Sequence, residues 1–357
     1  SFTKHSVSFT TDFSLRTVSR DFIKGNDMKI PRSTKFSTAF GSFLIAFIVT
    51  WTLQSLPSRD MEHSPWEPVI SQKDLPHRHN ALRGLSLADS LFNRTKVLCL
   101  IFTYPPNHYT RALHVERTWG KKCNKLYFMT TRKETDLPTV SLPIKETRNN
   151  LWNKTKATYR WAYQNHLQEY DWFFKGDDDT YAIVENMRYV LSFYNPDEAW
   201  FFGSRFKYYS RKGYMSGGGG YILSRESVRM LVENGLDDPK ICKLDPTGAE
   251  DAEMGKCMSA MNVSYGDTRD QFKRWRFFPF DMASFFRPES LKGLHWFWNM
   301  IYYNISMSMD CCSDTAVSYH YENPNKMYFY HYILYHMKAW KKSSSKSYLP
   351  KLLFIHL

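Results

Sequence analysis

Apolar residues along the chain form blocks whose spacing alternates between that of strands and that of helices. Residues 96–103 and 125–131 are short runs dominated by apolar side chains, which predicts buried strands. Between them, 111–119 is predicted to be helical. Residues 151–170 repeat aromatic and apolar side chains at helical spacing, and another apolar run then ends at Phe174. Strands that alternate with helices indicate an α/β domain with a mostly parallel sheet.

Three consecutive carboxylates, Asp177, Asp178 and Asp179, follow the last of these runs. Because like charges at close range repel, a fold that keeps them together usually supplies a cation. Oxygen ligands suit Mg²⁺ or Mn²⁺ better than Zn²⁺, and ligands bind beyond the carboxyl ends of parallel strands. We therefore expect a metal site here, with an acidic surface turn as the alternative. Asp177 and Asp179 form an Asp-x-Asp pair. His320 alone is typical of a core histidine, but together with this pair it becomes a candidate third metal ligand.

Three further segments carry groups that suit a ligand site. Arg111 and Arg117 flank the first predicted helix and suit phosphate contacts, with ordinary surface arginines as the alternative. The glycine run 217–220 lets a backbone pass close to a ligand, or forms a tight turn. Glu250 and Asp251 suit proton transfer from a hydroxyl, or a helix N-terminus with favourable dipole contacts.

An uncharged stretch at 36–56 has the length of one membrane-spanning helix. Basic residues precede it and acidic residues predominate after it, so the positive-inside rule predicts a cytoplasmic N-terminus and a luminal bulk. A cleaved signal peptide is the alternative. Residues 1–35 are then the cytoplasmic tail. We interpret 1–27 as an extension of the gene model, because Met28 begins a natural short tail.

The segments outside the predicted core have distinct compositions. Pro, Ser, His and charged residues dominate 57–91, which predicts a flexible stem ahead of a folded domain at 92–340. A lysine–serine stretch opens 341–357 and predicts a disordered tail. The net charge of +13 is dispersed, without an arginine-rich block. We therefore expect a generally basic surface and no nucleic-acid partner.

Six cysteines, an even number in a chain expected to be luminal, predict disulfides. Nearness in sequence suggests the pairs Cys99–Cys123 and Cys242–Cys257, which leaves the adjacent Cys311 and Cys312. Sequence alone does not choose among the pairings, and buried free thiols are the alternative. Four Asn-x-Ser/Thr sequons, which are acceptor sites for N-glycosylation, also fit a location in the secretory pathway.

Five motifs occur together in a characteristic order. They are Arg-x5-Arg-Thr-Trp-Gly from Arg111, Phe-Phe-Lys-Gly-Asp-Asp-Asp-Thr-Tyr from Phe173, Ser-Gly-Gly-Gly-Gly-Tyr from Ser216, Glu-Asp-Ala-Glu-Met-Gly from Glu250 and Ser-Tyr-His-Tyr from Ser318. Over residues 95–340 the chain therefore resembles the inverting β1,3-glycosyltransferases that include the fringe proteins. Within that family it most resembles the core 1 β1,3-galactosyltransferases.

The resemblance implies a GT-A type catalytic domain behind the single N-terminal transmembrane helix, in a type II protein of the Golgi membrane. It implies UDP-galactose as donor, α-linked N-acetylgalactosamine on Ser or Thr of glycoproteins as acceptor, and Mn²⁺ as cofactor. The product would be the core 1 O-glycan, the T antigen. A homodimer and a dedicated chaperone are further partners that the resemblance suggests.

Carried over residue by residue, Asp177, Asp179 and His320 would hold Mn²⁺ and the diphosphate. Asp178 would contact the nucleotide ribose or the same metal. The positions that would border the nucleotide-sugar are Arg111, Arg117, Gly217, Gly218 and Gly219.

Asp251 matches the family's general base, and Glu250 would place acceptor or donor hydroxyls. Tyr214 and Trp296 would contact the acceptor. Residues 1–27 and the lysine–serine tail have no counterpart in the family. Three other readings remain: another fringe-like β1,3-glycosyltransferase with the same site, a non-catalytic chaperone relative, which should lack the Asp-x-Asp pair, and a calcium-dependent lectin.

Overall fold

The computed structural model describes residues 87–338. The expected cytoplasmic tail, the membrane helix at 36–56 and the tail at 341–357 lie outside the described residues, as does most of the stem. Within 87–338, no helix combines the length and the apolar character that a membrane crossing requires. The first described helix, α2 (Leu87–Arg94), includes the last five residues assigned to the stem, and its Leu91 is buried.

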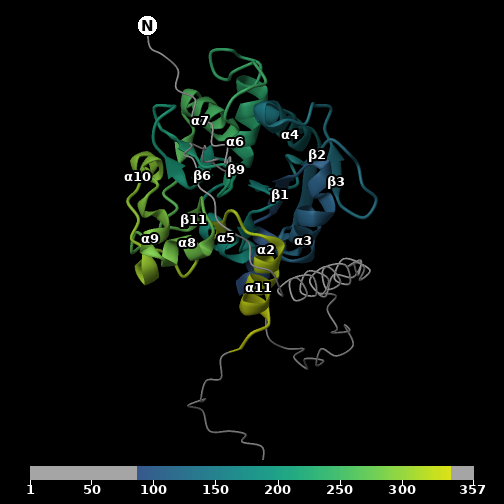
Figure 1. Cartoon of the computed structure of the whole chain (residues 1–357). Coiled ribbons are helices and arrows are strands. Elements are labelled where there is room, and N and C mark those ends of the chain that lie inside the picture. Colours follow the sequence, from purple (N-terminus) through teal and green to yellow (C-terminus); the bar gives the residue numbers. More distant parts are fainter. Residues whose placement is uncertain (1–86, 339–357) are drawn as a thin grey trace, which may run out of the picture. The chain divides into compact units, whose positions relative to one another are not determined.

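A seven-stranded mixed sheet forms the centre of the domain, in the order β10-β6-β9-β4-β1-β2-β3 (Figure 1). Its strands are β1 (Val97–Phe102), β2 (Lys125–Thr130), β3 (Thr139–Ser141), β4 (Trp172–Asp177), β6 (Trp200–Gly203), β9 (Tyr221–Ser224) and β10 (Ser264–Tyr265). The neighbours β4, β1, β2 and β3 run parallel, whereas β9 is antiparallel to both β4 and β6. The predicted α/β class with a mostly parallel sheet is confirmed.

Helices cover both faces of this sheet, which explains why β1 reads as an unbroken apolar run. Its odd-numbered residues, such as Cys99 and Ile101, pack with α3 (Leu113–Arg117) and α5 (Val184–Leu191). Its even-numbered residues pack on the opposite face. The helices there are α4 (Leu151–His166), α6 (Arg225–Met230) and α7 (Glu250–Ala260).

A second, smaller sheet lies beside the first and completes the domain. It has the order β11-β12-β5, with β11 at Phe277–Phe278, β12 at Ser318–Tyr319 and β5 at Tyr181–Ala182. An aromatic cluster supports it, in which the rings of Phe278 and Tyr319 stack 4.6 Å apart. The other elements of this region are the hairpin β7 (Arg205–Phe206) and β8 (Tyr214–Met215), α8 (Met282–Phe286), α9 (Pro288–Lys292), α10 (His295–Met300) and α11 (Pro324–Tyr335).

Most of the predicted elements are formed, with small shifts in their bounds. The helix expected at 111–119 begins earlier, as a π-helical turn at His108–Ala112 that continues into α3. The helix expected at 151–170 ends at His166. The disulfides Cys99–Cys123, Cys242–Cys257 and Cys311–Cys312 are formed, so nearness in sequence identifies the first two pairs correctly.

Candidate active site

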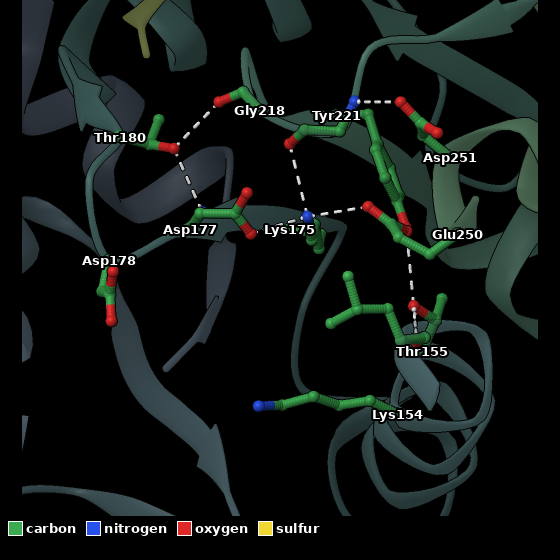
Figure 2. A network of polar contacts seen from close by, with 12 residues as sticks. Lys154, Thr155, Lys175, Asp177, Asp178, Thr180, Gly218, Tyr221, Glu250 and Asp251 are labelled. Atoms are coloured by element: carbon green, nitrogen blue, oxygen red, sulfur yellow. Dashed lines mark hydrogen bonds and ion pairs between the residues drawn. The ribbon is translucent and has the colours of Figure 1, made fainter. Parts of the chain in front are cut away.

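The carboxyl end of β4 carries the aspartates into a turn that is tied to the glycine run. Asp177 is the last residue of β4, and its backbone N–H donates to Thr180 Oγ1 at 3.0 Å. That hydroxyl in turn donates to the carbonyl oxygen of Gly218 at 2.9 Å (Figure 2). The turn after the strand and the loop of glycines are therefore held together, although they lie about 40 residues apart in the sequence.

Asp177, Asp179 and His320 present ligand atoms that all lie within 4.8 Å of one another. His320 Nε2 is 3.2 Å from Asp179 Oδ1 and 3.9 Å from Asp177 Oδ2. The other ring nitrogen, Nδ1, faces the carbonyl oxygen of Pro279 at 3.3 Å, and a carbonyl can only accept. This contact favours the tautomer that carries its proton on Nδ1 and leaves Nε2 free to bind a metal. Metal-binding histidines usually donate their other ring N–H in this way.

The chemistry of these three donors fits a first-row divalent ion such as Mn²⁺. Carboxylates suit Mg²⁺ and Mn²⁺, whereas an imidazole nitrogen is a poor ligand for Ca²⁺, which takes oxygen. The donor set therefore supports a site for a transition-type ion over the calcium site of a lectin. The retained Asp-x-Asp pair disfavours the reading of the chain as a non-catalytic relative.

Asp178 lines the same cleft as the other two aspartates, but its carboxylate is bound by the segment after β1. Its Oδ2 accepts hydrogen bonds from Thr103 Oγ1 at 2.7 Å and from Asn107 Nδ2 at 2.9 Å, both in the segment after β1. Burial raises the pKa of this carboxyl to about 6, even though the two hydrogen bonds act in the opposite direction. Asp178 is thus a buried anchor for the turn, and it is not part of the cluster of possible ligands.

Arg111 lies beside the three candidate metal ligands. Its Nη1 is 2.9 Å from Asp179 Oδ2 and 3.6 Å from Asp178 Oδ1. Burial by itself would raise the pKa of Asp179, but the contacts with His320 and Arg111 outweigh it and lower that pKa. Asp179 is therefore held as a carboxylate, the form that binds a cation.

Close packing explains why Gly217 and Gly218 are required beside the candidate site. A β-carbon on Gly218 would lie 2.1 Å from His320 Nδ1, and one on Gly217 would lie 2.4 Å from Glu250 Oε1. Any larger residue would displace the candidate metal ligand or the carboxylate. Gly219 is packed against the backbone of Phe278, and it does not line the cleft described below.

Asp251 lies in the first turn of α7, on the other side of the glycine run. Its Oδ2 accepts from the backbone N–H of Gly217 at 3.0 Å, and its Oδ1 accepts from that of Ala252 at 2.8 Å. Burial raises the pKa of the Asp251 carboxyl, although these two hydrogen bonds act in the opposite direction. A carboxylate that is partly desolvated and fixed in place suits the role of a general base.

Glu250, the residue before it, has both oxygens occupied. Oε1 accepts from Lys175 Nζ at 2.8 Å, and Oε2 accepts from the hydroxyls of Tyr221 at 3.1 Å and Thr155 at 3.3 Å. Burial raises the pKa of Glu250, and Lys175 acts against that rise. The acidic cluster is indeed a helix N-terminus, and within it Glu250 is a structural anchor while Asp251 is the better placed base.

Two buried lysines belong to the site, and sequence reasoning missed both. Lys154 donates to the carbonyl oxygen of Thr103 at 2.5 Å and to Glu146 Oε1 at 2.7 Å. Lys175 bridges Asp177 and Glu250 at 2.8 Å each. Burial alone would lower the pKa of Lys175, but the two carboxylates outweigh it and raise that pKa. The position of Lys175 between the apolar run that ends at Phe174 and the aspartates was the available signal, because buried lysines are almost always paired.

A cleft of about 1000 Å³ joins these groups. Its lining includes Asp177, Asp179 and His320, the glycines Gly217 and Gly218, and Glu250 and Asp251. Lys154, Arg148 and the aromatic side chains Phe280, Trp296 and Tyr321 line it as well. A second cavity of about 440 Å³, between residues 269–274 and 302–311, contains none of the predicted metal, substrate or catalytic residues.

The predicted acceptor contacts Trp296 and Tyr214 have different positions. Trp296 is 49% exposed and lines the cleft. Tyr214 is only 6% exposed, because its ring packs on Phe206, and it does not line the cleft. Arg117 lies exposed at the end of α3, outside the cleft lining, whereas Arg111 directly contacts the aspartates.

Comparison with known proteins agrees with this geometry. Residues 94–272 match the family described as Fringe-like. The chain is 39% identical over 306 residues to glycoprotein-N-acetylgalactosamine 3-beta-galactosyltransferase 1 of Xenopus laevis, with 85% of this chain and 84% of that protein covered. The chain belongs to the Fringe-like family. The part of this Fringe-like chain that matches the family contains the aspartates, the glycine run and Asp251, whereas His320 and Trp296 lie beyond it.

More distant relatives of this Fringe-like chain are also glycosyltransferases. A beta-1,3-glucosyltransferase of Mus musculus is 28% identical over 174 residues, which cover 48% of this chain and 34% of that protein. Among solved structures, a glycosyltransferase involved in the glycosylation of the major capsid of PBCV-1 has 15% identity and a TM-score of 0.25, with 40% of this chain and 69% of that chain covered. The last similarity is too weak to bear on the fold.

Proposed function

We propose that the chain is an inverting galactosyltransferase that moves galactose from UDP-galactose to the 3-hydroxyl of α-linked N-acetylgalactosamine on glycoproteins. One observation carries the proposal. The possible metal ligands Asp177, Asp179 and His320 and the separately held carboxylate Asp251 line one cleft, with the glycine run between them. The transferred galactose and the N-acetylgalactosamine acceptor are those in the name of the 39% identical relative, and UDP as the carrier follows from the family resemblance.

The residues of the cleft divide into two groups that suit the two substrates. Two cationic side chains of the cleft lining, Arg148 and Lys154, and Arg111 beside Asp179, suit the negative diphosphate of the donor. Aromatic side chains, Trp296, Phe280 and Tyr321, offer faces on which a sugar ring of the acceptor can pack.

Asp251 supplies the general base. The acceptor 3-hydroxyl oxygen bonds to the anomeric carbon as the bond from that carbon to the diphosphate oxygen breaks, and the hydroxyl proton passes to Asp251. Attack from the face opposite the leaving group converts the α linkage of the donor into a β linkage. One carboxylate therefore suffices, and Glu250, whose two oxygens are already engaged, keeps Asp251 in place.

Asp177, Asp179 and His320 would hold Mn²⁺ in this reaction. When bound, such an ion supplies charge stabilisation for the departing diphosphate. The chain's own part is to keep Asp179 ionised through Arg111 and His320, and to keep His320 oriented through Pro279. The proposed location is the Golgi lumen, which the family resemblance implies, behind a type II anchor at 36–56, whose orientation follows from the charge pattern of the sequence.

The test is a transfer assay with the purified full-length chain, UDP-galactose, Mn²⁺ and a peptide that carries α-linked N-acetylgalactosamine. We expect a mass gain of one hexose, released by a β1,3-specific galactosidase, and its loss in the D179A and D251N variants. UDP-glucose and UDP-N-acetylglucosamine serve as alternative donors. Transfer of one of these sugars in preference to galactose would contradict the choice of donor. Absence of all transfer by folded protein would contradict the proposed function.

A further inference from the structure

We propose that Lys175 is a positioning residue that fixes the distance between the metal-binding aspartates and the base Asp251. The inference rests on the proposed function, because it assigns to Lys175 a role in assembling that site. Figure 2 shows the Lys175 ammonium group between Asp177 and Glu250. The carbonyl oxygen of Gly217 is its third partner. The three partners belong to β4, to the start of α7 and to the glycine run.

The hydrogen bonds of Lys175 show why its role is positional. An ammonium group has three donors. Nζ lies 2.8 Å from Asp177 Oδ1, 2.8 Å from Glu250 Oε1 and 3.3 Å from the carbonyl oxygen of Gly217. Lys175 is 1% exposed, so all three donors are used inside the protein and none is left for a substrate. Lys175 therefore acts through its partners.

On the metal side, Lys175 binds only one of the two oxygens of Asp177. The other oxygen, Oδ2, is the one that lies 3.9 Å from His320 Nε2. A carboxylate fixed at Oδ1 cannot rotate freely about its side-chain bonds, so Oδ2 is kept on the side of His320 and Asp179. This is the arrangement in which an outer partner orients a metal ligand.

On the base side, Lys175 reaches Asp251 by two short routes. Glu250, which accepts from Lys175, is the first residue of α7 and directly precedes Asp251. Gly217 accepts from Lys175 through its carbonyl oxygen, while its N–H donates to Asp251 Oδ2 at 3.0 Å. Removal of the lysine would therefore loosen both supports of the base together.

The environment of Lys175 explains why a neutral residue would not serve. Its Nζ lies 4.8 Å from the centre of the Phe102 ring and 5.8 Å from that of Tyr221, so the surroundings other than the three acceptors are largely apolar. Without the cation, the buried carboxylate of Glu250 would lose its charged partner and would face Asp177 as a like charge. Removal of one partner of a buried ion pair is strongly unfavourable for this reason.

The experiment compares the full-length parent with K175M, K175R and the control K156M. Lys156 is also buried on the same domain, but its ammonium donates to the carbonyl oxygen of Leu244 and contacts no carboxylate. Two quantities are measured: the Mn²⁺ dissociation constant without substrates, from the electron paramagnetic resonance of free Mn²⁺, and kcat and KM for transfer. Circular dichroism reports whether each variant is folded.

We expect K175M to bind Mn²⁺ at least about tenfold more weakly and to lose at least about tenfold in kcat. K175R, which keeps the charge, should recover part of both losses, and K156M should behave as the parent in both. If K175M does not fold, the double variant K175M/E250Q, which removes both buried charges, carries the same expectation against E250Q alone.

A folded K175M with the parent's Mn²⁺ affinity and kcat would overturn the proposal. So would an equal loss in K156M, because the effect would then be one of general stability. The Mn²⁺ measurement needs no sugar transfer. If the parent transfers no sugar, the proposed function fails, while weaker Mn²⁺ binding by K175M would still support the role of Lys175 at the metal side.

Discussion

Gly218 lies directly against the imidazole of His320, so closely that a β-carbon at position 218 would be 2.1 Å from Nδ1. The same glycine accepts a hydrogen bond from Thr180 through its carbonyl oxygen. The glycine run is thus the surface on which the candidate metal ligand rests, and the turn that holds Asp177 and Asp179 is tied to that surface. The orientation of His320 depends on a residue that has no side chain.

Substitution of Gly218 by alanine should therefore impair metal binding without removing any ligand. In G218A the new methyl group forces the imidazole away from Asp177 and Asp179, and we expect a loss of about tenfold or more in Mn²⁺ affinity. Calorimetric titration with Mn²⁺ measures this loss. Gly293 is the matched control, because a β-carbon there meets nothing within 4 Å. Equal Mn²⁺ affinities in G218A and G293A would contradict the role given to the glycine.

Replacement of His320 by glutamine should raise the Mn²⁺ concentration needed for half-maximal transfer by about 10- to 100-fold. Asp177 and Asp179 remain in H320Q, so excess Mn²⁺ should restore part of the rate. The measurement is the initial rate of transfer against Mn²⁺ concentration. His114, which pairs with the hydroxyl of Tyr328 outside the cleft, supplies the control variant H114Q. An unchanged Mn²⁺ dependence in H320Q would exclude His320 as a ligand.

The pH dependence of transfer should follow the raised pKa of Asp251. The base is active as a carboxylate, so kcat/KM should fall as pH decreases through that pKa, above the usual aspartate value of about 4. D251N should lower kcat by about 10²- to 10⁴-fold and abolish this acid limb. The control E253Q changes a carboxyl in the same helix that pairs with Lys256. An acid limb that persists in D251N would point to another base.

The same raised pKa has a consequence for stability. The folded protein holds the Asp251 proton more tightly than the unfolded chain does. The contribution of this group to the free energy of unfolding is therefore largest below the usual aspartate pKa, and it decreases as pH rises through the raised pKa. Urea unfolding at several pH values should show a shallower decrease for D251N than for the parent. Equal pH dependences of the two proteins would contradict the raised pKa.

Removal of the Cys99–Cys123 disulfide should destabilise the domain by about 3 kcal/mol, because it frees a loop whose ends are 24 residues apart in the sequence. The double variant C99A/C123A tests this by urea unfolding. The control C311A/C312A removes a bond between adjacent residues, which closes almost no chain, so a clearly smaller loss is expected. A larger loss in the control would show that chain entropy does not govern these bonds.

The fold could be predicted from the sequence to the extent that its pattern is local. Strand β1 was predictable because it is buried along its whole length, and helix α4 was predictable because it is buried along one face. The reversed direction of β9 was not predictable, because the pattern of four buried residues is the same in a parallel and in an antiparallel strand. The short second sheet was missed because strands of two residues have no periodicity.

The candidate site was predictable where several motifs point to one chemistry. The sequence indicated the Asp177–Asp179 cluster, His320 and Asp251, and all three line the cleft. Contacts between residues distant in sequence were not predictable, such as that of Lys175 with Glu250, 75 positions away. The burial of Tyr214 depends on the packing of its ring against Phe206, which no motif encodes.

The antiparallel direction of β9 decides which loops can meet at the cleft. Parallel strands send only the loops that follow them to one edge of a sheet, whereas a reversed strand brings the loop that precedes it. Tyr221, the first residue of β9, pairs with Lys175 near the end of β4, so the glycine run arrives beside the aspartates. A change in the length of the loop ahead of β9 would therefore also move the surface against which His320 lies and the turn that is tied to it through Thr180.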